Sequence, residues 1–252
     1  MSAAAWLRGT SRDMVAAFQF LTRLPMPRIA FDAGSLARSV KFFPLVGLGV
    51  GTGAALLHWA LAPHMTPVVE AWVMLTYLVL ITGCFHEDAL ADVADSLGAW
   101  TRERRLEIMR DSRIGSYGAA ALVLSIAGRL LLLRSLPAGR LAAYVIVAQV
   151  LCRWSTLPLS YFLPAVQGTG QGARIARLSS RSSLLLGSTF SVAVAVVALH
   201  RAAVAPLVVV AVLTAAGGWF FMRRLGGITG DCFGAVNQMT EIAVYVCGVW
   251  TA

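Results

Sequence analysis

Charged side chains are scarce in this chain of 252 residues, where Asp, Glu, Lys and Arg together make up 13% of the sequence. That is about half of their usual share in a soluble domain. Apolar residues make up 58%, and the mean hydropathy is +0.74. A soluble fold of this length would be unable to bury so much apolar surface. The composition therefore argues against a disordered chain, a collagen-like repeat and a conventional cytosolic enzyme, and predicts an integral membrane protein.

Three other features are missing. The four cysteines form no CxxC pair and lie in or beside apolar stretches, so neither a disulfide nor a zinc site is expected. No basic tract is longer than two residues, so the net charge of +9 does not indicate a nucleic-acid partner. The N-terminal region has no clean apolar core that ends in a cleavage site, so no signal peptide is expected.

Long apolar stretches are what the sequence has instead. A membrane span needs about 20 mostly apolar residues, and seven stretches are candidates: 42–62, 68–85, 117–136, 141–163, 184–199, 202–222 and 233–252. Residues 14–24 predict a short amphipathic helix at the membrane interface, which Pro25 and Pro27 would stop. The expected fold is all-α: one membrane-embedded domain over 1–252, a polytopic helix bundle of about seven spans in the lipid bilayer.

The basic residues predict the orientation of these spans. Sixteen Arg and Lys residues fall in four segments on one predicted side, and three fall on the other side. Those four segments are 1–41, 86–116, 164–182 and 223–232. Because basic loops stay in the cytoplasm, 1–41 is expected to be a cytoplasmic N-terminal segment and 86–116 a cytoplasmic acidic segment.

Acidic residues gather in one place. Seven of the twelve lie between Glu87 and Asp111. Asp88, Asp92 and Asp95 have the spacing i, i+4 and i+7, which places them on one face of a helix where they repel each other. No Lys or Arg separates them. We therefore predict that a divalent cation binds between them, with Mg²⁺ favoured by the oxygen ligands; the alternative is a solvated acidic face.

Several neighbouring residues extend this predicted site. Arg110 and Arg113, followed by Gly115 and Gly118, are suited to clamp phosphate oxygens, and Asp111 would add a fourth carboxylate. His86 is either a general base or a helix cap. The lone cation Arg153, inside an apolar stretch, needs an anionic partner or a wet cavity.

A second polar segment, 226–241, precedes the last apolar stretch. It carries Asp231, Asn237, Gln238 and Glu241. Uncompensated acids there suggest a functional site that converges with Asp88, whereas the alternative is a loop in which Asp231 caps a helix. The glycine-rich stretch 166–174 is a flexible loop or a phosphate cradle. The glycines of the first span, Gly47 to Gly53, indicate close packing within the chain or a homo-oligomer contact.

These segments resemble the cobalamin (5′-phosphate) synthases, also called adenosylcobinamide-GDP ribazoletransferases. The resemblance runs nearly end to end, through FLTRLPMP (20–27), FFPLVGLGVG (42–51), FHEDALADVADS (85–96), RLEIMRDSRIGSYG (105–118) and GGITGDCFGAVNQMTE (226–241). The chain departs from the family where glycine is common, at Cys84, Ala89 and Ser96. The resemblance implies a Mg²⁺-dependent transferase of the bacterial inner membrane. It would join adenosylcobinamide-GDP to α-ribazole or α-ribazole 5′-phosphate and release GMP.

Combining this chemistry with the residues gives a set of expected roles. The metal ligands are expected among Asp88, Asp92, Asp95, Asp111 and Asp231. Asp95 is also expected as the group that takes the proton from the ribose hydroxyl, with His86 as a further catalytic candidate. The expected phosphate and substrate contacts are Arg110, Arg113, Arg153, Asn237, Gln238 and Glu241.

Other classes of membrane protein fit less well. A CDP-alcohol phosphotransferase would need Gly after Asp95, where Ser96 stands, and a later pair of aspartates. An aspartate-rich prenyltransferase would need a second Asp-rich loop. A secondary transporter would show pseudo-repeated halves, and the sequence has no internal repeat.

Overall fold

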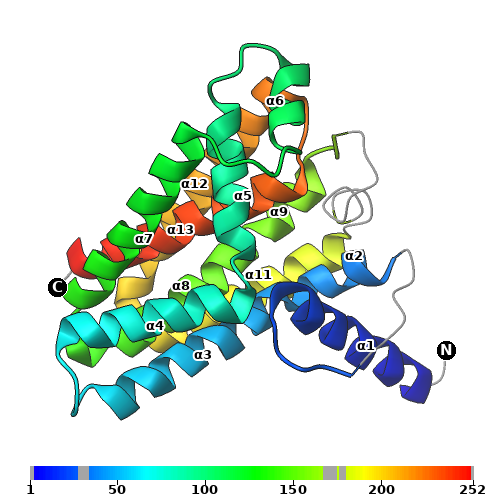
Figure 1. The fold of residues 1–252 in the computed structure, drawn as a ribbon. Helices are drawn as coiled ribbons and strands as arrows, with labels where there is room; N and C mark the ends of the chain where they lie inside the picture. Colours follow the sequence, from blue (N-terminus) through cyan, green and yellow to red (C-terminus); the bar gives the residue numbers. More distant parts are fainter. Residues whose placement is uncertain (1–2, 28–33, 167–174, 176–179, 251–252) are drawn as a thin grey trace.

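In the computed structural model, residues 3–27, 34–166, 175 and 180–250 are described. Their regular structure is helical, apart from a single bridge between Ala165 and Ile228, which confirms the all-α expectation. The helices are α1 Ala3–Leu21, α2 Ser35–Ser39, α3 Phe43–Leu61, α4 Pro67–Thr82, α5 Phe85–Ser96, α6 Arg102–Ile108, α7 Ser116–Ser135, α8 Ala138–Trp154, α9 Thr156–Phe162, α11 Arg181–Leu199, α12 Val204–Leu225 and α13 Gly230–Trp250. Figure 1 shows their arrangement as a bundle.

Among the residues that the structure describes, four helical stretches are long and apolar enough to cross a membrane: Ser35–Leu61, Ser116–Ser135, Ala138–Phe162 and Arg181–Leu225. A fifth results if α4 and α5, which are bent by 84°, form one broken span. The exposed side chains of α7 and α12 include Leu124 and Trp219, as expected for faces that meet lipid. An integral membrane bundle is thus confirmed, but the expected count of seven spans is not.

The difference in the count has a physical origin in the sequence. Two expected spans lie together in the 45-residue stretch Arg181–Leu225, where a 3-10 turn with φ 50° at His200 separates α11 from α12. A third expected span lies within α13, where buried polar residues such as Asn237 and Glu241 lower the mean hydropathy of the helix. Because α13 packs against α5, α7, α8 and α12, its polar side chains meet protein in the bundle interior.

The N-terminal helix differs from the expectation in its bounds. It was expected over 14–24, but α1 spans Ala3–Leu21. The alanines at its start favour helix, and the prolines lie beyond its end. The carboxylate of Asp13 accepts hydrogen bonds from Arg38 at 3.3 Å and from Lys41 at 3.0 Å. These contacts tie α1 to the segment that leads into α3.

Glycines let the central helices approach closely. A side chain at Gly47 or Gly51 of α3 would overlap with the backbone of α8, and one at Gly53 would overlap with Tyr77 of α4. The glycine face of the first predicted span is therefore used inside the chain. Helices α3 and α8 consequently pack closely against each other.

A sharp turn connects α4 to α5. Gly83 and Cys84 have φ of 66° and 60°, in the left-handed region that non-glycine residues rarely adopt. This explains why the resembled family commonly has glycine at position 84. In Figure 1, α5 consequently stands steeply against α4, with α13 passing behind it.

Candidate active site

The acidic segment forms the helix that its spacing predicted. Asp88, Asp92 and Asp95 all lie on α5, with Asp88 exposed and the other two partly buried. Asp92 is repelled by the nearby carboxylates of Asp88, Asp231 and Asp95. Four like charges are therefore held close to one another, which is unfavourable unless a cation or a donor-rich ligand meets them.

Asp231 reaches this cluster from the other end of the sequence. It lies in the first turn of α13, near Asp88. Gly234, one turn further along, faces Ala89 of α5, and a side chain at position 234 would overlap with it. The structure therefore brings Asp231 and Asp88 together, as expected from the sequence, and a glycine permits the approach.

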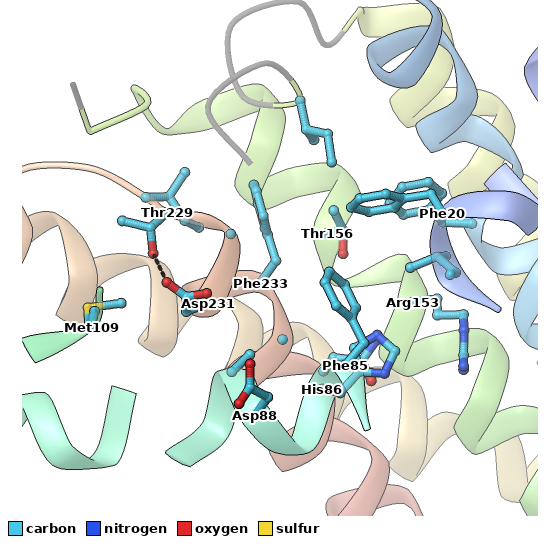
Figure 2. A pocket seen from close by; sticks show the side chains of 18 of the residues that line it. Phe20, Phe85, His86, Asp88, Met109, Arg153, Thr156, Thr229, Asp231 and Phe233 are labelled. Carbon is cyan, nitrogen blue, oxygen red and sulfur yellow. Dashed lines mark hydrogen bonds between the residues drawn. The ribbon is translucent and has the colours of Figure 1, made fainter. Parts of the chain in front are cut away.

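A cavity of about 350 Å³ lies between α5 and α13 and extends toward α1 and α8. In the view of Figure 2, Asp88 and Asp231 lie at one end, and Phe20, Thr156 and Arg153 lie at the other. Phe85, His86 and Phe233 lie between the two ends. Of the other expected substrate contacts, Arg110 and Asn237 also line the cavity. The cavity thus has an acidic end and an aromatic end that carries a cation.

Two deeply buried polar side chains on this cavity have unsatisfied atoms. Arg153 is 1% exposed, and its Nε has no hydrogen-bond partner in the part of the chain that the structure describes. Its Nη1 donates to the carbonyl oxygen of Gln149 at 3.0 Å and to Gln149 Oε1 at 2.6 Å. Asn237 is 3% exposed, and its Oδ1 likewise lacks a partner among the described residues. Buried polar groups of this kind are normally paired, so they suit a bound polar ligand.

Asp95 has a contact that its expected catalytic role did not anticipate. Its Oδ2 accepts the backbone N–H of Gly115 at 2.7 Å, and its Oδ1 accepts that of Gly118 at 2.8 Å. These donors belong to the N-terminal end of α7, where a carboxylate is stabilised by unpaired N–H groups and the helix dipole. Asp95 is not among the residues that line the cavity. The structure therefore shows Asp95 joining α5 to α7, and its expected role as base and metal ligand stays a prediction.

Gly118→Ala is expected to lower the midpoint of thermal unfolding, because a side chain at Gly118 would overlap with the Asp95 carboxylate. Overpacking of this kind costs about 1–3 kcal/mol. The matched control is Gly128→Ala on the same helix, where a Cβ would meet nothing within 4 Å. Thermal unfolding in detergent should separate the two variants. Equal midpoints would contradict the structural role of the Asp95 contact.

The segment 110–113 divides into a cavity residue and a surface pair. Arg113 donates to both carboxylate oxygens of Asp111, at 3.0 and 3.1 Å from Nε and at 2.6 Å from Nη2. These hydrogen bonds lower the pKa of Asp111 to about 2. Neither residue lines the cavity, whereas Arg110 does. The structure thus places Asp111 and Arg113 outside the cavity, and their expected roles at the metal and the phosphates stay predictions.

Gln238 and Glu241 lie in a buried hydrogen-bond network inside the bundle. Arg129 of α7 pairs with Glu87 at 2.9 Å and with Glu241 at 3.7 Å. Gln238 donates to Glu87 at 3.2 Å, and Tyr245 donates to Glu241 at 3.1 Å. Neither Gln238 nor Glu241 lines the cavity. Their contacts join α5, α7 and α13, so the expected substrate contacts of these two residues stay predictions.

Several residues of the cavity and of the network beside it were not predicted from the sequence. The partners in this network, Glu87 and Arg129, carried a signal, since an arginine in an apolar stretch requires an acid nearby. Phe20, Phe85 and Thr156 carried no such signal beyond their place in or near the resembled motifs.

His86 is buried beside the ring of Phe85, at 5.4 Å between ring centroids, and lines the cavity. Its expected role as a base or as a helix cap stays a prediction. The glycine-rich stretch 166–174 lies outside the described residues except for Val166.

The donor set of the acidic end fits Mg²⁺. Among the described residues, no three His, Cys, Asp or Glu side chains form a ready metal cage. Mg²⁺ does not require one, because it keeps several waters and binds through one or two carboxylates plus substrate phosphates. Asp88 and Asp92 of α5 and Asp231 of α13 supply hard oxygen ligands, and α5 carries no Lys or Arg. Asp88 and Asp231 line the cavity, and Asp92 lies near them without lining it, so a Mg²⁺ ion held by these carboxylates stays a prediction.

The fold and the cavity define a helical membrane protein with one small-molecule site. Carboxylates and a buried arginine surround that site, and these are the side chains that phosphoryl transfer uses. The chain belongs to the cobalamin-5-phosphate synthase family, whose sequence model matches residues 13–249.

Curated relatives agree with this assignment. An adenosylcobinamide-GDP ribazoletransferase of Ralstonia nicotianae is 37% identical, with 98% of this chain and 99% of the relative covered. The enzyme of that name from Azorhizobium caulinodans is 39% identical, with 94% of each chain covered. The one from Vibrio cholerae is 35% identical, with 96% of this chain and 95% of the relative covered. No solved structure matches the chain.

Proposed function

We propose that this protein is a Mg²⁺-dependent adenosylcobinamide-GDP ribazoletransferase. It transfers the adenosylcobinamide-phosphate moiety of adenosylcobinamide-GDP to α-ribazole or its 5′-phosphate, and it releases GMP. The product is adenosylcobalamin or its 5′-phosphate, in the last steps of cobalamin synthesis. Full-length similarity to relatives of that name supports the reaction. The observation that carries the site is the convergence of Asp88 and Asp231, from distant segments, on one cavity that also holds Arg153.

The cavity residues divide the chemistry between them. The acceptor hydroxyl forms a new bond to the phosphorus that bears the corrinoid, and the bond from that phosphorus to the GMP oxygen breaks. Bound Mg²⁺ would neutralise charge on the leaving phosphate. Arg110, which lines the cavity, binds phosphate oxygens, and Arg153, at the other end of the cavity from Asp88 and Asp231, serves as a substrate contact away from the phosphates. A carboxylate of the acidic cluster that is not coordinated to the metal would accept the proton of the attacking hydroxyl.

Product analysis tests this function. The purified protein in lipid nanodiscs is given adenosylcobinamide-GDP, α-ribazole and Mg²⁺, and GMP release is followed by chromatography. GMP should form only when both substrates and Mg²⁺ are present. CMP release from a CDP-alcohol, without GMP release from adenosylcobinamide-GDP, would instead support a phospholipid phosphotransferase.

The proposed location is the bacterial inner membrane, with the active site facing the cytoplasm. A cysteine placed at Ser112 should therefore remain unlabelled by an impermeant thiol reagent in intact cells, because 86–116 is expected on the cytoplasmic side. The background is Cys84→Gly, which removes an exposed thiol. Ser135→Cys, at the opposite end of α7 from residue 116, is the matched control and should be labelled. Labelling of Ser112→Cys from outside would overturn the orientation.

A further inference from the structure

Three phenylalanines from separate helices form a continuous aromatic wall that runs from one end of the cavity, at Phe20, to its middle, at Phe85. The ring centroids of Phe20 of α1 and Phe43 of α3 are 5.9 Å apart with near-parallel planes, at 19°. Phe20 and Phe85 of α5 are 5.3 Å apart and meet edge to face, at 75°. All three line the cavity. Phe85 remains 40% exposed, so this wall has an open aromatic surface next to the acidic helix.

We propose that this aromatic end binds the base of the acceptor nucleoside, so that the ribose extends toward the carboxylates of Asp88 and Asp231. The inference rests on the proposed function and assigns one part of the cavity to one substrate. Aromatic side chains provide a stacking surface for a heteroaromatic base. Phe85 directly precedes the acidic segment along α5. The ribose of a nucleoside whose base is held there can therefore reach toward the acidic side chains.

The size of the cavity limits what it admits. At about 350 Å³, it lies near the lower end of the range for small-molecule sites, about 300–1,000 Å³. A nucleoside fits this space, whereas a corrin macrocycle with its side chains does not. The corrinoid part of the donor substrate therefore lies outside the cavity, and the enclosed space is left for a nucleoside from one of the two substrates.

The unpaired donor at the aromatic end suits the base of the acceptor. The polar groups beside the wall are Arg153, which only donates hydrogen bonds, and the hydroxyl of Thr156 and the imidazole of His86, which can donate or accept. The benzimidazole base of α-ribazole presents one ring-nitrogen acceptor and no N–H donor, so the unpaired Nε of Arg153 suits it. Guanine presents N–H donors as well, which require acceptors such as carboxylates. The cavity carboxylates that Figure 2 labels, Asp88 and Asp231, lie at the opposite end.

Phe85→Leu and Phe20→Leu test the subsite, because leucine keeps apolar bulk but removes the aromatic face. In the full-length protein in nanodiscs, KM for α-ribazole should rise about tenfold in each variant, the effect expected for losing one stacked face. KM for adenosylcobinamide-GDP and kcat should stay within about twofold of wild type. Phe162→Leu is the matched control, because Phe162 lies on α9, is 70% exposed and lines a different groove.

Direct binding gives a second readout that does not require turnover. Calorimetric titration with α-ribazole should show about a tenfold weaker Kd for Phe85→Leu, with the Kd for GMP unchanged. A weaker Kd for GMP with an unchanged Kd for α-ribazole would assign the wall to guanine and overturn the inference. Unchanged values for both ligands would also overturn it. Failure of the proposed function has a different signature, namely no GMP release by the wild-type protein.

Discussion

Asp92→Asn is expected to abolish turnover while the protein still folds and inserts into the membrane. Asp92 lies between Asp88 and Asp95 on α5 and is repelled by both and by Asp231. Removing one charge from this cluster weakens a Mg²⁺ site directly, because the ion depends on the remaining carboxylates. A fall in kcat of at least about a hundredfold is expected, in line with the loss of electrostatic stabilisation in a transition state.

The same substitution should not destabilise the protein. Neutralising Asp92 relieves repulsion within the cluster, so the midpoint of thermal unfolding should stay constant or rise. The matched control is Glu107→Gln on α6, whose exposed carboxylate pairs with Arg104 at 2.7 Å and is not among the residues that line the cavity. The control should keep its activity. Near-normal turnover of Asp92→Asn at ordinary Mg²⁺ and substrate concentrations would count against the acidic end as the metal site.

Local periodicity was enough to predict the acidic helix. The spacing of Asp88, Asp92 and Asp95 fixes a helical face without knowledge of the rest of the fold, and α5 has that form. The meeting of Asp231 with Asp88 was also predictable, because the order of the spans and their basic loops put both at the same membrane side. In each case, the prediction followed from a strong local pattern or from the order of spans and loops along the sequence.

What the sequence left open depends on packing between helices. Nothing in the pattern of Asp95 shows that its carboxylate meets the N–H groups of Gly115 and Gly118. Similarly, Gln238 and Glu241 are of residue types that often bind ligands, but their side chains contact the interior network of Arg129. The partner of such a side chain depends on which helix faces meet. A polar residue on a buried face can bind a ligand or pair with another polar residue.

The expected span count was not confirmed for a related reason. Hydropathy indicates whether a segment lies in lipid or in water, but a helix in the middle of a bundle contacts neither of them. α13 carries buried Asn237, Gln238 and Glu241 because it is surrounded by other helices. The aromatic wall was missed because phenylalanine in an apolar chain is indistinguishable from core until the cavity is known.

Asp231→Ser is expected to reduce turnover by two or more orders of magnitude with little change in stability. The competing interpretation was that Asp231 merely caps α13. In the structure, the Cys232 N–H donates to the hydroxyl of Thr229 at 3.4 Å, so Thr229 supplies a cap. Asp231 instead lines the cavity beside Asp88. A serine at 231 would retain a capping side chain, since loss of a cap costs about 1 kcal/mol, but it cannot replace a carboxylate ligand.

Asp111→Ser is the informative comparison, because Asp111 and Asp231 were both expected to complete the metal site. Asp111 pairs with Arg113 away from the cavity, so its variant should stay within about threefold of wild-type turnover, as surface substitutions usually do. Steady-state GMP release and thermal unfolding are measured for both variants. Wild-type activity in Asp231→Ser would end the shared-cavity hypothesis, and a selective loss in Asp111→Ser would move the site to the loop before α7. The expected order, with Asp231 far more sensitive than Asp111, follows because only Asp231 is held against the acids of α5.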